Sequence, residues 1–203
     1  MTFGARDAIP ILTVAQLIGN GSRTWFNRSH LDWKVVAWFA IGAIPAAIAG
    51  ALLFAAAPLS ALTRLLGVFL IAVVVYRHVA KSTPRIPVRA FAPLGAGASF
   101  LSALIGSVGP LMAPFFLAYG LTKGAYIGTE ATCSLLMHVV TLIVYGKASL
   151  LTATGASVGL LIGAGLIVGS YLGSRLVNRV PGRVFVWLVE ATLIISGLRF
   201  LAG

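Results

Sequence analysis

The residues best placed to do chemistry in this sequence interrupt a long apolar stretch between residues 91 and 120. A proline inside a helix removes a backbone hydrogen bond and clashes with the preceding turn, so the stretch is expected to break into two half-helices. The start of a half-helix offers free N–H groups and the positive end of a dipole to an anion. We therefore predict either an anion-binding site or a purely structural hairpin tip at Gly106, Ser107, Gly109 and Pro110.

Two further polar faces are predicted to contact the same substrate. Gln16, Asn20 and Arg23 are spaced i, i+4 and i+7, which places them on one face of a helix. Arg23 would guide an anion with its charge and planar donors, or would only mark the cytoplasmic end of that helix. Thr129 and Thr132 open a later helix, where their hydroxyls would bind either the anion or their own backbone.

Three ionisable side chains within apolar segments are candidates for ion coupling. A charged group inside a membrane is costly, and it suggests either a function or a buried partner. Glu130 lies near a helix start, where it would otherwise complement the dipole or pair with Lys123. Glu190 lies near the middle of the last apolar segment. His138 has no second ligand at metal-binding spacing, and an isolated histidine is also typical of hydrogen-bonded packing.

The motifs of several enzyme classes are absent from the sequence. No nucleotide-binding loop, serine nucleophile elbow or zinc-ligand spacing occurs, and Gly95-x-Gly97 alone does not indicate a dinucleotide site. Cys133 is the sole cysteine, so neither a disulfide nor a cysteine-based metal site is expected. The chain is therefore predicted not to be an enzyme and to need no cofactor or metal.

Composition predicts the class of fold. Hydrophobic residues make up 59% of the chain and charged residues 9%, whereas soluble domains carry about 25% charged residues. The mean hydropathy is +1.01. The net charge of +11 does not indicate nucleic-acid binding, because the basic residues form short clusters between apolar runs. We predict an all-α, polytopic transmembrane helix bundle that forms a single domain, residues 1–203.

Apolar runs between the charged clusters predict the individual membrane spans. The candidate spans are residues 8–22, 35–56, 59–76, 129–145, 152–172 and 184–201. Residues 91–120 are too few for two full crossings, because a helix rises only about 1.5 Å per residue. We predict that they form a broken, re-entrant helix pair that enters and leaves the membrane on one side.

The basic clusters predict the orientation of these spans. They lie at residues 23–34, at 77–89 and around Pro181. Because Lys and Arg in short loops favour the cytoplasm, these three loops are predicted to be inside. The uncharged turn at 56–60 and the loop with only Lys147 are then outside. This order requires that residues 91–120 make no net crossing.

An internal repeat relates the two halves of the chain. Residues 26–31 align with 145–150, and the small-residue pattern at 42–58 aligns with that at 165–181. The proline turn that ends the pattern is uncharged in the first copy and basic in the second. The two turns are therefore predicted on opposite membrane faces, as inverted repeats require.

The repeat also predicts boundaries and helix contacts. Repeat one would comprise residues 1–80, with a cytoplasmic linker at 81–90 and repeat two at 91–203. Small residues four positions apart allow helices to approach closely in lipid. We predict such contacts for the following small residues: Ala46, Gly50, Gly165, Gly169 and Gly173.

The sequence resembles the TauE/SafE family of sulfite-exporter-like permeases. The resemblance rests on Gly106-x2-Gly109-Pro110-Leu111-x2-Pro114, Gly120-Leu121, Ala125-x2-Gly128-Thr129 and Tyr145-Gly146-Lys147, and more weakly on Ala8-x-Pro10 and Leu31-Asp32-Trp33. It implies a plasma-membrane transporter of small sulfur-containing or carboxylate anions, built from two related halves. The family's first glycine-rich half-helix would precede Phe3, so repeat one is expected to lack this element.

Together these features predict a secondary transporter or permease, multi-pass in the plasma (bacterial inner) membrane. Its substrate would be a small anion such as sulfite or a sulfonate, bound between the break and the two polar faces. Its partners would be this anion and the lipid bilayer, without nucleic acid, and a homo-oligomer is compatible with the sequence. The alternatives are a passive anion channel and a truncated, non-transporting membrane protein.

Overall fold

The fold is all-α throughout the part of the chain that the structure describes. The computed structural model describes residues 5–58, 85–106, 108–181 and 184. Its helices are α1 (Ala5–Phe26), η1 (Arg28–His30), α2 (Trp33–Ala56), η2 (Val88–Ala90), α4 (Phe91–Ile105), α5 (Gly109–Tyr119), α6 (Lys123–Lys147) and α7 (Ala153–Arg179). The predicted all-α class is thus confirmed.

Three of these helices are long and apolar enough to cross a membrane. They are α2, α6 and the Ala153–Leu176 part of α7. The predicted spans at 35–56, 129–145 and 152–172 fall on them. Residues 8–22 form most of the more polar α1. The predicted spans at 59–76 and 184–201 lie outside the described residues, apart from Val184.

The predicted break between residues 91 and 120 is present. Helix α4 ends at Gly106, whose φ of +93° lies in the left-handed region that favours glycine. Helix α5 begins at Gly109 with Pro110 in its first turn, where the missing N–H group costs no helix bond. It ends at Gly120, again with a left-handed φ of +107°.

The last residues of α5 lie next to the first residues of α4. Phe91 begins α4, while Phe116 and Tyr119 lie at the end of α5. The ring of Phe91 lies 5.1 Å from that of Phe116 and 5.5 Å from that of Tyr119, measured between centroids. The start of α4 and the end of α5 are therefore adjacent, as the prediction of no net crossing requires.

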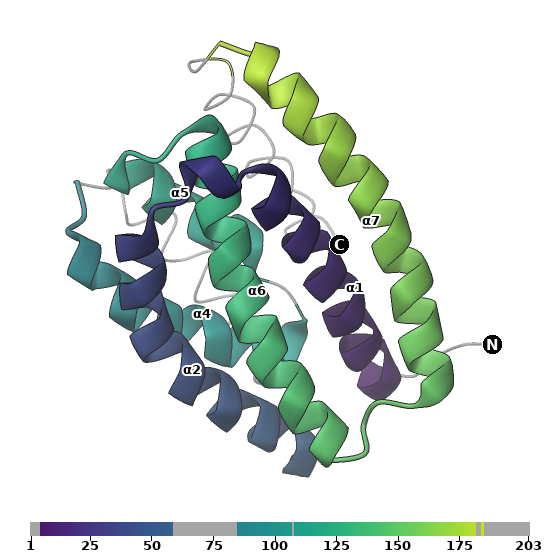
Figure 1. The fold of residues 1–203 in the computed structure, drawn as a ribbon. Coiled ribbons are helices and arrows are strands. Elements are labelled where there is room, and N and C mark those ends of the chain that lie inside the picture. Colours follow the sequence, from purple (N-terminus) through teal and green to yellow (C-terminus); the bar gives the residue numbers. More distant parts are fainter. Residues whose placement is uncertain (1–4, 59–84, 107, 182–183, 185–203) are drawn as a thin grey trace, which may run out of the picture.

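Helix α6 lies at the centre of the described helices. Figure 1 shows α1 and α7 side by side on one flank of α6, and α2 with α4 on the other. The pairs α1 with α7 and α2 with α6 each run parallel, as the successive contacts Ile11–Gly155 and Ile18–Gly163 show for the first pair. In the predicted repeat, α1 corresponds to α6 and α2 corresponds to α7. An inverted repeat would therefore map the α1–α7 pair onto the α6–α2 pair. The two-fold relation between the halves stays a prediction.

The glycines of the repeat pattern pack differently in α2 and in α7. In α2, Gly50 approaches α4, and a Cβ built on it would lie 2.6 Å from the carbonyl oxygen of Phe100. In α7 the predicted contacts are not formed with any described helix. Gly165 and Gly169 are exposed, and a Cβ on either would meet no described atom within 4 Å.

A second glycine row of α7 makes the close contact instead. Cβ atoms built on Gly159 and Gly163 would lie 2.7 Å from Val14 and 2.5 Å from Ile18 of α1. The two rows lie on different faces of α7, and only the second faces α1. In lipid, such contacts stabilise helix pairs through van der Waals packing.

We expect Gly159→Val to destabilise the protein by about 1–3 kcal/mol, because the added atoms overlap Val14 and the Ile11 carbonyl in a packed interface. Gly165→Val makes the same chemical change on the exposed face of α7 and is expected to have little effect. Thermal unfolding of both variants in detergent would measure the difference. Equal stability of the two variants would contradict the α1–α7 interface.

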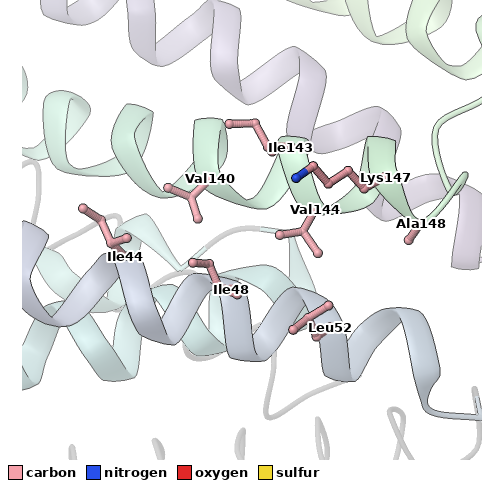
Figure 2. A pocket seen from close by; sticks show the side chains of 8 residues that line it. All are labelled: Ile44, Ile48, Leu52, Val140, Ile143, Val144, Lys147 and Ala148. Atoms are coloured by element: carbon pink, nitrogen blue, oxygen red, sulfur yellow. The ribbon is translucent and has the colours of Figure 1, made fainter.

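An open groove lies between α2 and α6, away from the polar residues of the bundle. Figure 2 shows its lining: Ile44, Ile48, Leu52, Val140, Ile143, Val144, Lys147 and Ala148. Its walls are hydrocarbon with one lysine at the end, so it lacks the convergent polar groups that orient a small ligand. We therefore place the candidate site on the polar face of α6 instead.

Candidate functional site

An ion pair between α1 and α6 forms the centre of the candidate site. Arg23 Nη2 donates to Glu130 Oε2 at 2.5 Å, and the side chains are 32% and 6% exposed. Arg23 Nη1 also donates to Asn20 Oδ1 at 3.1 Å. The Ser134 hydroxyl donates to Glu130 Oε1 at 2.9 Å. The structure thus brings together three of the predicted residues, Asn20, Arg23 and Glu130.

This ion pair lies against the predicted helix break. A Cβ built on Gly109, the first residue of α5, would lie 3.2 Å from Glu130 Oε1. The first N–H groups of a helix have no intrahelical acceptor, and the helix dipole favours negative charge at this end. The Glu130 carboxylate therefore occupies a position suited to an anion. The absence of a side chain at Gly109 lets it approach the backbone.

The alternative pairing of Glu130 with Lys123 is not the one observed. In the described residues the ion-pair partner of Glu130 is Arg23. Lys123 begins α6 with a positive φ of 50°. The role of Arg23 as a guide for an anion stays a prediction.

The two predicted threonines contact the protein itself. Thr129 Oγ1 accepts a hydrogen bond of 3.0 Å from the backbone N–H of Asp32, which caps the start of α2. The Thr132 hydroxyl bonds to the carbonyl oxygen of Gly128 at 2.8 Å and lies 3.2 Å from Thr24 Oγ1. These bonds join α6 to α1 and α2. A role of Thr129 and Thr132 in substrate binding stays a prediction.

A buried polar face extends along α6 from the ion pair. Glu130, Ser134, His138 and Thr141 are spaced by four, four and three residues, and each is at most 5% exposed. His138 thus lies about two helical turns from Glu130 on the same face. The sequence reasoning identified Glu130 and His138 but missed Ser134 and Thr141. Their helical spacing is the signal that could have found them.

The remaining predicted residues are less closely associated with the ion pair. Gln16 is half-buried on α1, and Gly106 forms the left-handed end of α4. Pro110 lies in the first turn of α5. Ser107 and Glu190 lie outside the described residues.

A second polar position lies one turn before the break. Ser102 is 4% exposed, and its hydroxyl has no hydrogen-bond partner within the described part of the chain. Its backbone carbonyl accepts from the Gly106 N–H at 2.7 Å.

As for metal sites, no group of three His, Cys, Asp or Glu side chains suited to a metal occurs in the described helices.

The arrangement supplies what a small oxyanion requires. A guanidinium offers several N–H donors in one plane, and the amide of Asn20 and the hydroxyl of Ser134 add neutral polar groups. The start of α5 adds the positive end of a helix dipole. Such a site would bind an anion reversibly without covalent chemistry.

Comparison with known proteins identifies the family of the chain. The family model described as Sulfite exporter TauE/SafE matches residues 1–200. Neither the comparison with curated proteins nor the comparison with solved structures found a match. The family match covers nearly the whole chain, including the break, Arg23 and Glu130. The chain belongs to the sulfite exporter TauE/SafE family of membrane permeases.

Proposed function

We propose that this chain is a secondary transporter that carries sulfite or a small sulfonate across the bacterial inner membrane. The observation that carries the proposal is the ion pair of Arg23 with the buried Glu130 at the start of half-helix α5. Discontinuous helices that present their N-terminal ends to anionic groups are a recurrent way of building transport sites. The family membership supports the transport of a sulfur oxyanion over other anions.

In this proposal Arg23 is the main anchor of the substrate. Its guanidinium would donate to two oxygens of a sulfite or sulfonate group, while Asn20 holds the arginine in place. Ser134 would contact a third oxygen, because its hydroxyl now donates to Glu130 Oε1, the oxygen that lies beside Gly109 at the start of α5. The apolar side chains of α5 would limit access of water to this site.

Flux in proteoliposomes tests the proposal. We expect purified protein to exchange labelled methanesulfonate and sulfite with saturation, and each anion to compete with the other. Methanesulfonate stays an anion over the whole working pH range, so it does not leak through lipid as a neutral acid. Protein-free liposomes give the background rate.

Two outcomes would contradict this function. Anion flux no faster than in protein-free liposomes would mean that the chain does not transport these anions. Flux that rises linearly with concentration, without competition, would support a passive channel instead.

A further inference from the structure

The donor groups assigned to the substrate converge on a carboxylate of the protein itself. Glu130 Oε2 accepts from Arg23 at 2.5 Å. Its Oε1 accepts from Ser134 at 2.9 Å and is the atom that faces Gly109 at the start of α5. Glu130 therefore occupies the place that the proposed function gives to a sulfur oxyanion.

An anion and an ionised Glu130 cannot share this site at low cost. Both are negatively charged acceptors, and Arg23 is the guanidinium that contacts the position. A 6% exposed carboxylate that lost this partner would be a buried, uncompensated charge beside a second negative charge. Binding of the anion is therefore favoured when Glu130 carries a proton and is neutral.

Within the described residues, few other groups near Glu130 could take this proton. On α6 itself, Tyr126, Cys133 and His138 lie close enough to interact electrostatically with Glu130. From α1 the facing charged group is Arg23, and the described sequence of α5 contains no charged side chain. Of these groups, only Glu130 is ion-paired with the arginine in the described residues.

We propose that Glu130 is the proton-coupling residue of this permease and acts by competing with the substrate for Arg23. A proton from one side binds the Glu130 carboxylate and breaks its ion pair, which leaves the guanidinium free to bind one monovalent oxyanion. When the anion leaves on the other side, the proton returns to water and the ion pair forms again. One proton and one anion thus move in the same direction without net charge. This inference rests on the proposed anion transport.

The first test compares wild type with Glu130→Gln in proteoliposomes that contain a pH-sensitive dye. An inward gradient of methanesulfonate should acidify the lumen in wild type. In Glu130→Gln the amide keeps the size of the side chain but cannot carry the proton. We expect its labelled-anion exchange to continue at a rate independent of pH between about 5 and 8, while acidification falls at least about tenfold.

Asp7→Asn is the matched control. It makes the same carboxylate-to-amide change on the exposed first turn of α1 and should keep the acidification of wild type. Acidification by Glu130→Gln at the wild-type ratio of protons to anions would overturn the proposal. So would loss of anion exchange in a Glu130→Gln protein that remains folded and monodisperse.

A second measurement needs no variant. Calorimetric titration of wild type with methanesulfonate, in buffers of different ionisation enthalpy, counts the protons taken up per bound anion. We expect close to one proton near neutral pH and tighter binding as the pH falls. Saturable anion binding and flux without proton uptake would overturn this inference alone, whereas absence of both binding and flux would overturn the proposed function.

Discussion

Arg23→Gln is expected to lower both the stability of the protein and its anion flux, and a second change, Glu130→Gln, should restore only the stability. Removing Arg23 leaves the Glu130 carboxylate buried and without its ion-pair partner. Breaking a fully buried pair in this way costs about 3–5 kcal/mol, and we expect a smaller loss here because the Arg23 side chain is 32% exposed. The double variant removes both charges, so this penalty disappears. Anion flux stays low in both variants because the guanidinium anchor is missing.

The expected loss of flux is about 100-fold at subsaturating substrate. Hydrogen bonds to charged groups contribute about 1.5–3 kcal/mol, and each 1.4 kcal/mol corresponds to about a factor of ten. Thermal unfolding and methanesulfonate exchange would be measured on the same preparations. Arg6→Gln is the control, because exposed Arg6 binds the carbonyl oxygens of Ala55 and Ala57 at the end of α2 and, in the described residues, lies outside the candidate site. Wild-type flux in the double variant would contradict the role of Arg23 as anchor.

The helix break could be predicted from sequence because its causes are local. Gly106 and Gly120 end their helices with positive φ angles, and Pro110 begins a helix where it needs no N–H acceptor. The transmembrane class could also be predicted, because the hydrophobic composition reflects the lipid in which the helices must be stable. Neither property depends on which helices later become neighbours.

The partner of Glu130 could not be predicted in the same way. Arg23 lies 107 residues away along the chain, and the local spacing offered Lys123 as the partner instead. The pairing follows from the packing of α1 against α6, which the sequence leaves open. The hydroxyls of Thr129 and Thr132 are ambiguous for a related reason, since a short polar side chain bonds whichever group packing brings close.

The glycines of α7 show how a correct motif can be assigned to the wrong face. The helix contains two rows of glycines at four-residue spacing, and each satisfies the requirement for close approach. Only the row with Gly159 and Gly163 faces α1. The sequence alone contains no information that ranks the two rows, because both lack a Cβ equally.

Gly42→Ala is expected to be the most damaging single methyl addition in the described helices. The added Cβ would lie 1.9 Å from the carbonyl oxygen of Ala92 and 3.0 Å from the backbone nitrogen of Ala96. Both atoms belong to the backbone of α4, so no side-chain rotation can relieve the overlap. Either α2 and α4 separate, or α4 shifts and carries the break at Gly106 with it.

We expect this variant to lose more than about 3 kcal/mol of stability, at or beyond the upper end for overpacking, and to accumulate poorly in the membrane. A loss of stability would be informative, because alanine in a helix interior is intrinsically more stabilising than glycine by about 1 kcal/mol. Gly97→Ala on α4 is the matched control. It is exposed, with no described atom within 4 Å of the new Cβ, and should be neutral or slightly stabilising.

Measurement of flux in the same pair would connect this packing to the proposed site. The position of α5 relative to Glu130 depends on α4, because the two half-helices are joined at the break and by the contacts of Phe91. Gly42→Ala protein that remains folded at low temperature should therefore exchange methanesulfonate more slowly than Gly97→Ala. Wild-type stability and flux in Gly42→Ala would mean that α2 and α4 are not in backbone contact. The hairpin would then have to be held by other helices.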